Sequence, residues 1–355
     1  MCRLEFFLVA AALAQAPIEL SPAPAYYPRL LPGTPNASAL GVIEAPNSTY
    51  RRLVLLARTS ASADAPWAAT GAVVAAANAA NATDLSNGFL LRMRSGVILC
   101  AFRHHDSANE ARVYRIQVVS SSNGGVTWSA AVTVTEGLVG VWEPFLSQDA
   151  SGEVRVYYSA ELTNGGEQDI VRQSSSDGGR SWGPVDARIH TPQSRNGMPG
   201  VTVLSDNSLL AVFEGFWSPS GWGHYTVNSA RSFDGGTTWV QREIVHAPAN
   251  STQNAGSPQV ATSVDGRVVV IFMSSEEDSS VGNAGSWPDG AHLATSIASL
   301  DPNNTSAPLV FSAPVPVPST NNVFWPSLFP DDATRNIRAV WQSSSGTAEL
   351  GGAVC

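Results

Sequence analysis

The stretch "SSSDGGRSW" at residues 174–182 places two adjacent glycines between an aspartate and a tryptophan, and it recurs along the chain. Near-copies are "SSSNGGVTW" at 120–128 and "RSFDGGTTW" at 231–239. Adjacent glycines permit the positive φ angles of a tight hairpin, Asp or Asn can accept hydrogen bonds from the backbone of its own turn, and a Trp ring can pack over a sheet. We interpret each copy as a turn between two strands that its own side chains stabilise.

A second repeat divides the chain into units of similar length. Proline, or glycine in one case, opens an apolar run in "YPRL" at 27, "NGFL" at 87, "EPFL" at 143, "MPGV" at 198, "SPQV" at 257 and "WPSL" at 325, at intervals of 60, 56, 55, 59 and 68 residues. Each run is followed by a turn and a second run, such as "GVILCAF" or "NSLLAVFE", with the β-branched and aromatic residues typical of strands. The pattern predicts an all-β fold, a six-bladed β-propeller whose blades are four-stranded antiparallel sheets.

Three of these units depart from the pattern, and one of them, the fifth, lacks a good Gly-Gly turn. The first, between Gly41 and Ala82, is alanine-rich and irregular, and "SASADAPW" at 60–67 retains only the Ser and Trp of the turn. The last is short, because the chain stops 30 residues after Trp325. Since a ring leaves no room for an incomplete blade, we expect "PIELSPAP" at 17–24 to supply an outer strand to the sixth blade.

The first 16 residues have the features of a signal peptide. Arg3 precedes an apolar run from Phe6 to Leu13, and Ala14-Gln15-Ala16 is a small-x-small cleavage pattern. No later segment approaches ~20 consecutive apolar residues, so no membrane span is expected. We predict a secreted, extracellular protein in which residues 17–355 form a single catalytic propeller domain. Sequons that fit this route are Asn36, Asn47, Asn81, Asn250, Asn303 and Asn304.

Charge and cysteine content exclude several kinds of partner. The net charge is -9 and every basic residue is an arginine, which argues against nucleic acid. Without Cys2, only Cys100 and Cys355 remain, too few for a disulfide scaffold or a cysteine-built metal site. Cys100 lies inside "GVILCAF" and is interpreted as a small buried hydrophobic residue. We expect a neutral or weakly charged ligand, no metal, no cofactor and a monomer.

Strand direction indicates which residues meet at one end of the propeller. If the Gly-Gly turns join third and fourth strands on the lower face, then first strands start and second strands end on the upper face. The starts of first strands supply Tyr27, Arg29, Asn87, Glu143, Met198, Ser257 and Trp325. The ends of second strands supply Arg103, His104, His105, Asp106, Tyr158, Glu161, Glu214, Glu276, Glu277 and Trp341.

Three carboxylates in this set are candidate catalytic groups. Glu143 stands beside "PFL" and Glu214 directly after "LLAVF", so both enter a partly desolvated place that raises a carboxyl pKa. Acid and base catalysis requires such tuning. Glu161, which ends "VYYSAE", is the third candidate. A structural ion pair is the alternative for each of them.

The other candidates are polar and aromatic residues that suit a sugar. "RHHD" at 103–106 resembles a metal site, but adjacent histidines on a strand point in different directions and lack a spaced third ligand. We therefore expect Arg103 and Asp106 to bind substrate by hydrogen bonds. Aromatic rings offer flat faces to sugars, although they also fill cores. The remaining predicted substrate-binding residues are Arg29, Asn87, Trp142, Tyr158, Tyr225 and Trp325.

Four segments carry a resemblance to a known family. They are "GVWEPFLSQDASGEVRVYYSAE", "EQDIVRQSSSDGGRSW", "GMPGVTVLSDNSLLAVFE" and "NAGSPQVATSVDGRVVVIFMSSEED". In this order they resemble the fungal six-bladed propellers of glycoside hydrolase family 93, relatives of the sialidase superfamily, over roughly residues 85 to 345. Members are secreted exo-acting arabinanases that release arabinobiose from α-1,5-linked arabinan with retention of configuration. The resemblance implies that two funnel glutamates carry the reaction, Glu143 and Glu214, with Glu161 as a substitute for either.

Two other functions are alternatives. An exo-α-sialidase needs three arginines around the sialate carboxylate and a tyrosine nucleophile paired with a glutamate. Arg29, Arg103 and Arg195 could take that role, although no Phe-Arg-Ile-Pro segment precedes the first Gly-Gly turn. A non-catalytic glycan-binding propeller is the other alternative, because one fold hosts many functions. Its carboxylates would lie too far apart to share one sugar.

Overall fold

The computed structural model describes residues 17–34, 37–78, 83–106, 112–162, 166–217, 223–276, 287–288, 290–318 and 322–354. Within these ranges the chain forms strands β1 to β24, as predicted for the all-β class. They contain no helix of the length and apolar character that a membrane crossing requires. The predicted signal peptide lies outside the described residues, as do Asn36, Asn81, Glu277 and Cys355.

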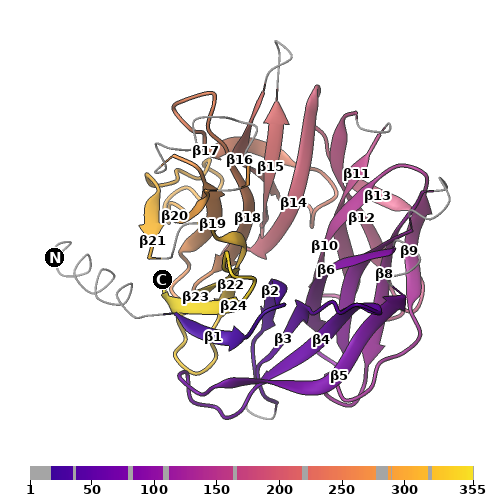
Figure 1. Cartoon of the computed structure of the whole chain (residues 1–355). Coiled ribbons are helices and arrows are strands. Elements are labelled where there is room, and N and C mark those ends of the chain that lie inside the picture. The colour runs from indigo at the N-terminus through magenta and orange to yellow at the C-terminus, as the bar shows by residue number, and fades with distance from the viewer. Residues whose placement is uncertain are drawn as a thin grey trace.

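Antiparallel sheets stand around a common axis as the blades of a propeller (Figure 1). One sheet consists of β2 (Tyr26–Leu31), β3 (Leu40–Glu44), β4 (Tyr50–Arg58) and β5 (Trp67–Asn78). The next consists of β6 (Thr83–Arg92), β7 (Ile98–Asp106), β8 (Val113–Ser121) and β9 (Val132–Gly137). A third consists of β18 (Ala255–Thr262), β19 (Val268–Ser274), β20 (His292–Ala298) and β21 (Val315–Val317). A fourth combines β22 (Phe324–Pro330), β23 (Ile337–Gln342) and β24 (Ala348–Ala353) with β1 (Ile18–Ser21).

The middle of the chain forms one eight-stranded sheet. Its strands are β10 (Val141–Gln148), β11 (Val154–Glu161), β12 (Gln168–Ser175), β13 (Val185–Ile189), β14 (Ser194–Val203), β15 (Leu209–Trp217), β16 (His224–Ser232) and β17 (Val240–His246). Gln168 of β12 pairs in parallel with Arg195 of β14, and the Gln168 amide donates to the Asn196 carbonyl at 2.8 Å. The described residues therefore do not form the six separate sheets that the sequence predicts. They form four sheets of four strands and one of eight, because these contacts bridge two strand groups.

The first strands of successive strand groups line the axis. Strands β2, β6, β10, β14, β18 and β22 contact one another in this order, and β22 contacts β2. The two ends of the described chain close the ring, because β1 pairs with β24 and places Ile18 opposite Leu350. In Figure 1, indigo β1 lies beside yellow β24. This confirms the prediction that residues near 17–24 supply an outer strand to the last blade.

The apolar cores lie between neighbouring strand groups. Cys100 of β7 and Leu53 of β4, for example, belong to one buried cluster that joins the first two sheets. Cys100 is a buried free thiol, as its apolar context predicted. Strand β19, "VVVIFMS", is buried along its whole length because it has a core on each side. This explains why second strands appear in the sequence as continuous apolar runs.

The Gly-Gly turns are stabilised as their sequence predicts. In the turn after β16, the Asp234 carboxylate accepts hydrogen bonds from the backbone N–H of Thr237 and Thr238 at 3.1 and 2.9 Å. Hydrogen bonds stabilise the charged form of Asp234 and lower its pKa to about 2, with the Thr238 hydroxyl as the largest cause. Trp239 then packs into the core against the preceding strand group, in a T-shaped contact with Tyr157. Each turn thus ties one blade to the one before it.

The first unit forms a complete four-stranded sheet, and the irregularity expected from its sequence is limited to register shifts in the β4–β5 pairing. Strands β2 to β5 form a complete antiparallel sheet, and the alanines of β5 pair with β4. Trp67 ends the degenerate turn and packs against Phe329 at a centroid distance of 6.0 Å. Alanine is a weak strand signal, so the order of β5 comes from its pairing with β4.

Candidate active site

A β-bulge occurs near the start of every inner strand. The bulged residue is left-handed in each case: Tyr27 (φ 50°), Asn87 (57°), Glu143 (44°), Met198 (53°), Ser257 (50°) and Trp325 (48°). The pairing register shifts at the same points. Positive φ is uncommon outside glycine, and bulges of this kind re-aim a side chain at functional sites. The bulges turn these residues out of the ladder at the funnel end of the sheets.

Polar atoms from the preceding strand group accept the N–H groups that the bulges release. Glu44 Oε1 accepts from Asn87 N at 2.8 Å, and Glu214 Oε2 accepts from Ser257 N at 2.7 Å. Gln342 Oε1 accepts from Tyr27 N at 3.4 Å, and the Met273 sulfur accepts from Trp325 N at 3.2 Å. The neutral side chains of Gln342 and Met273 accept these N–H groups as the two glutamates do. A bulge N–H therefore does not require a negatively charged acceptor.

Glu214 lies at the centre of the candidate site. Its carboxylate fits between two glycines: a Cβ on Gly256 would be 2.6 Å from Oε2, and one on Gly197 would be 3.1 Å from Oε1. Burial raises the pKa of Glu214 to about 7; the Ser257 N–H lowers it, and the negative charge of Glu143 raises it further. A carboxyl group with this pKa can be present as acid or base near neutral pH.

Glu143, at the bulge of β10, lies close enough to Glu214 for its charge to act on that carboxyl group. Burial raises the pKa of Glu143, while the charge of Arg103 opposes this effect. The charge of Glu143 also acts on Glu214 and on Tyr225. The structure therefore brings together the two glutamates that the sequence singles out, although they are 71 positions apart in the chain.

Tyr225 and Trp287 line the side of the site next to Glu214. Their rings are stacked at 6.4 Å with an interplanar angle of 26°. Burial raises the pKa of Tyr225 to about 12, with the Glu214 charge as the next cause, so its hydroxyl stays protonated. A Cβ on Gly256 would lie 3.3 Å from the Trp287 ring. Trp287, which sequence reasoning missed, thus adds an aromatic wall beside a carboxylate.

A cavity of about 470 Å³ extends from Glu143 toward β2, β6 and β22. Its lining residues are Tyr26, Tyr27, Glu44, Asp84, Ser86, Asn87, Arg103, Glu143, Trp325 and Gln342. The predicted residues Asn87, Arg103 and Trp325 are therefore brought together here. Arg103 pairs with Asp84 at 2.8 Å, and its guanidinium lies 5.3 Å from the ring of Trp142.

Glu44 is a partly buried carboxylate of this cavity that the sequence analysis did not single out. Burial raises its pKa, and the Ser86 hydroxyl and Asn87 N–H oppose the shift. Glu44 ends "LGVIE" as Glu214 ends "LLAVFE", so the same second-strand rule would have found it. The alanine-rich first unit conceals this second strand in the sequence.

Arg29 and Tyr27 form the floor of the funnel. Arg29 is 2% exposed, donates to the Pro28 and Trp325 carbonyls at 2.9 and 3.0 Å, and lies 3.9 Å from the centroid of the Tyr27 ring. The Tyr27 hydroxyl reaches the Met198 sulfur of β14 at 4.0 Å. Burial raises the pKa of Tyr27 to about 12. Arg29 is buried and bonded to the backbone at two of the bulged strands, so it is not exposed for the substrate contact predicted for it.

Three other predicted residues have structural partners away from the cavity. Glu161 forms an ion pair with Arg195 at 2.9 Å. Asp106 accepts from Arg115 at 2.6 Å and from Thr83 at 3.0 Å. Tyr158, only 2% exposed, packs in the core between β6–β9 and β10–β13 and donates to Gln173 at 2.6 Å. Arg195, the partner of Glu161, still lies close enough to the glutamates for its charge to lower the pKa of Glu214.

The adjacent histidines of β7 contact different partners, as predicted. His104 Nδ1 contacts Gln117 at 2.8 Å, whereas His105 Nε2 contacts the Val141 carbonyl at 2.8 Å. Burial lowers the pKa of His105 to about 4, so it stays neutral.

Glu276 also has partners within the fold, since it contacts His246 and accepts a hydrogen bond from Ser274. Within the described residues no group of three His, Cys, Asp or Glu side chains is arranged to hold a metal ion.

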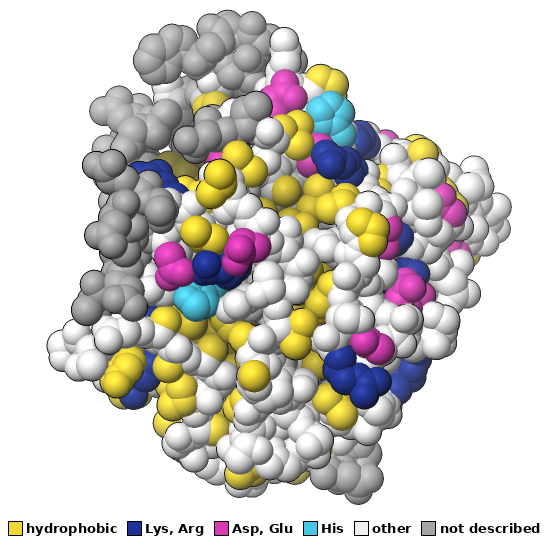
Figure 2. All heavy atoms as spheres, turned by 90° about the vertical axis from the view of Figure 1, so that its right-hand side faces the viewer, with side chains coloured by type: hydrophobic (Ala, Val, Ile, Leu, Met, Phe, Trp, Pro, Cys, Tyr) yellow, Lys and Arg dark blue, Asp and Glu magenta, His cyan; other side chains and the backbone are white. Residues whose placement is uncertain are grey.

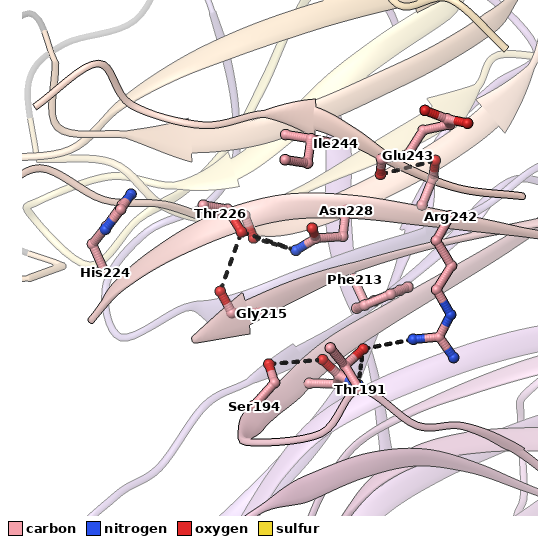
Figure 3. A pocket seen from close by; sticks show the side chains of 12 residues that line it. Thr191, Ser194, Phe213, Gly215, His224, Thr226, Asn228, Arg242, Glu243 and Ile244 are labelled. Atoms are coloured by element: carbon pink, nitrogen blue, oxygen red, sulfur yellow. Dashed lines mark hydrogen bonds between the residues drawn. The ribbon is translucent and has the colours of Figure 1, made fainter. Parts of the chain in front are cut away.

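A second hollow of about 320 Å³ lies on strands β14 to β17, and neither Glu143 nor Glu214 lines it (Figure 3). Phe213 lies at its base, and Arg242 donates to Thr191 at 2.6 Å across it. Its lining contains only one carboxylate, Glu243, so it lacks the paired acids of the funnel. Elsewhere on the surface drawn in Figure 2, acidic and basic side chains lie side by side in small mixed groups.

The comparisons with known proteins concern the fold. No family model and no curated protein sequence matches the chain. An α-L-arabinanase of Penicillium chrysogenum, solved with arabinobiose, is 19% identical with a TM-score of 0.65, over 95% of this chain and 98% of that one. The α-L-arabinofuranosidase Arb93A of Fusarium graminearum, solved with an iminosugar inhibitor, is 19% identical with a TM-score of 0.64 and the same coverage. The NanB sialidase of Streptococcus pneumoniae is 9% identical with a TM-score of 0.60, over 96% of this chain and 70% of that one. The chain thus has the sialidase-like propeller fold.

Proposed function

We propose that this protein is an exo-acting glycoside hydrolase that cleaves α-1,5-linked arabinan and releases arabinobiose with retention of configuration. The observation that carries the proposal is the pair of partly buried carboxyl groups Glu143 and Glu214, in which the negative charge of Glu143 raises the pKa of Glu214. Two carboxyl groups flanking one sugar are the usual apparatus of glycoside hydrolysis. The fold shared with arabinan-degrading propellers and the resemblance to glycoside hydrolase family 93 support arabinan as the substrate.

We assign the acid/base role to Glu214 and the nucleophilic role to Glu143. A carboxyl group with a pKa of about 7 is partly protonated near neutral pH, so Glu214 can protonate the leaving-group oxygen as the glycosidic bond breaks. Glu143 then forms a bond to the anomeric carbon. In the second step Glu214 takes a proton from water, the water oxygen attacks the anomeric carbon, and Glu143 leaves. Glu143 loses its negative charge when it bonds to the anomeric carbon. A partly desolvated environment disfavours that charge and therefore favours this step.

Six blades are part of the proposal. The eight-stranded sheet would count as two blades bridged at one residue pair, because both β10 and β14 begin with a bulge and lie in the inner ring. Each core between neighbouring strand groups would then be an interface between blades.

A sialidase is supported less well by the arginines. Arg103 pairs with Asp84, Arg195 pairs with Glu161, and Arg29 is buried beneath Tyr27 with carbonyl partners. A site for sialate needs three guanidinium groups directed at one carboxylate. A non-catalytic glycan-binding propeller would not require a carboxyl pKa near neutrality, which argues for catalysis.

We further propose a secreted monomer with residues 1–16 as its signal peptide and a carbohydrate as its partner. The mixed charges of the surface in Figure 2 and the net charge of -9 fit a neutral glycan better than nucleic acid.

The test is to incubate the purified protein with debranched arabinan and, separately, with sialyl-lactose, and to identify the released sugars. We expect arabinobiose from the first and no product from the second. Glu143→Ala should reduce turnover by orders of magnitude and leave the propeller folded. Release of sialic acid would favour the sialidase, and no release from either substrate would favour the binding protein.

A further inference from the structure

Two cavities meet beside Glu44 and form one cleft. The cavity of about 470 Å³ that contains Glu143 shares Tyr26, Glu44 and Asp84 with a second cavity of about 360 Å³. The second cavity continues outward, and its other lining residues are Pro46, Arg51, Arg52, Thr83 and Leu85. The cleft thus leads from the proposed nucleophile to the surface along the seam between β3 and β6.

Glu44 lies where the two cavities join, and only one of its carboxylate oxygens accepts hydrogen bonds from the described residues. Oε1 accepts from Asn87 N at 2.8 Å and also from the Ser86 hydroxyl. In the described part of the chain, no hydrogen-bond partner is found for Oε2, and Glu44 is only partly buried by its neighbours. One carboxylate oxygen is therefore available to the cleft.

A comparison within the ring shows that the fold alone does not call for a carboxylate here. Gln342, at the end of β23, caps the bulge of Tyr27 with its amide oxygen, as Glu44 at the end of β3 caps Asn87. A buried carboxylate costs more than an amide, because burial disfavours its charge. The bulge therefore does not explain why residue 44 is a carboxylate, whereas a ligand in the cleft would explain it.

We propose that this cleft binds the sugar units next to the reacting one, and that Glu44 positions them by accepting a hydrogen bond from a sugar hydroxyl. The inference rests on the proposed glycosidase function. The chemistry is that of a neutral oligosaccharide, because Asp84 is already paired with Arg103 at 2.8 Å and the ring of Tyr26 offers an apolar face. A hydroxyl-to-carboxylate hydrogen bond is short and strong, which suits a positioning residue.

The decisive variant is Glu44→Gln, because it separates the two roles. Its amide oxygen can still cap Asn87, as Gln342 caps Tyr27, while the atom that faces the cleft becomes an NH₂ donor. The matched control is Glu349→Gln, where the carboxylate accepts from Trp341 Nε1 at 2.9 Å outside the cleft. The measurements are kcat and KM on linear α-1,5-arabino-oligosaccharides, thermal unfolding, and saturation-transfer NMR with the same oligosaccharides.

We expect Glu44→Gln to raise KM about 10- to 100-fold, the loss expected for one hydrogen bond to a charged group, with kcat changed less and the unfolding temperature unchanged. Glu349→Gln should match the wild type in KM. If the wild type is active and Glu44→Gln has an unchanged KM, the inference is overturned and the proposed function stands. If the wild type is inactive, the proposed function fails. The NMR signal then decides: oligosaccharide binding that Glu44→Gln weakens supports the cleft, and unchanged or undetectable binding overturns it.

Discussion

The carboxylate of Glu214 occupies space that two glycines leave open. Gly197 and Gly256 precede the bulged residues of β14 and β18, and any side chain there would meet the glutamate. Neither glycine is in a left-handed conformation, so the requirement is for space and not for backbone freedom. At the scale of single residues, the site depends on the absence of side chains at Gly197 and Gly256 as much as on the presence of Glu214.

Gly256→Ala should therefore impair activity without unfolding the protein. The added Cβ would be 2.6 Å from Glu214 Oε2 and must displace the carboxylate. A displacement of this size can reduce turnover about 100-fold. The control is Gly137→Ala, whose Cβ would meet nothing closer than 4.0 Å. Steady-state kinetics and thermal unfolding of both variants test the idea, and equal activities would contradict it.

Glu214→Gln should change how stability depends on pH. The pKa of Glu214 is raised from its ordinary 4.5 to about 7, so the folded protein binds this proton more tightly than the unfolded chain. The wild type must then lose stability as pH rises from about 4.5 to 7, by up to about 3 kcal/mol. The glutamine keeps the acceptor for Ser257 N and has no proton to lose.

The measurement for this variant is the free energy of unfolding in urea at pH 4, 6 and 8. The difference between Glu214→Gln and the wild type should grow in favour of the variant as pH rises. Parallel curves would mean that Glu214 titrates as an ordinary carboxyl group.

At the scale of elements, the Gly-Gly turns join consecutive blades. The second glycine of each turn has a left-handed backbone, as in Gly125 with φ 92°, and it also packs closely: a Cβ there would be 2.5 Å from Leu55 of the preceding sheet. The turn therefore needs glycine for two reasons at once. Its aspartate or asparagine then fixes the loop from within.

Asp234→Ala should destabilise the protein, whereas Asp234→Asn should retain most of the stability. Asn123 occupies the equivalent position in the turn after β8 and accepts from Thr127 N at 3.0 Å without a charge. Thermal unfolding at pH 7 compares the two variants. The pKa of Asp234 is lowered to about 2, so its contribution should be present above about pH 4 and be lost as pH falls toward 2. Equal unfolding temperatures for the two variants would show that the turn does not depend on this acceptor.

At the scale of the whole molecule, the ring is closed by strands from the two ends of the described chain. Strand β1 is the outer strand of the last sheet, and Leu20 on it is buried in the cluster that also contains Trp67 and Phe329. The first and last sheets are thus held together partly by one short strand. Because every inner strand contributes to the funnel, weakening this closure affects the whole site.

Leu20→Ala should reduce the free energy of unfolding by about 2–5 kcal/mol, the usual effect of a buried leucine truncated to alanine. Glu19→Ala, on the same strand but exposed, is the matched control and should leave stability nearly unchanged. Urea unfolding of both variants provides the measurement. If Leu20→Ala behaved as Glu19→Ala does, β1 would contribute nothing to ring closure.

Much of the fold followed from local patterns in the sequence. The Gly-Gly turns, the Pro- or Gly-marked strand starts and the closing strand at 17–24 are short-range signals, because each depends on backbone sterics or on alternation along one segment. The same reasoning selected Glu143 and Glu214, since a carboxylate next to an apolar strand must enter a partly desolvated environment. It failed for Glu44, because alanines concealed a regular sheet, and for Tyr158, which could face either the funnel or a core.

The sequence by itself determined the all-β propeller class, and it singled out Glu143 and Glu214 as the acidic residues of the proposed site. Only the tertiary structure decided that Arg29 is a buried brace, that Glu161 and Asp106 are held in ion pairs, and that Glu44 opens onto a cleft. The physical reason is that a strand's own residues set its pleat, whereas the partner of each side chain comes from a neighbouring strand or blade. That partner fixes the side chain's burial, its charge and its access to a ligand.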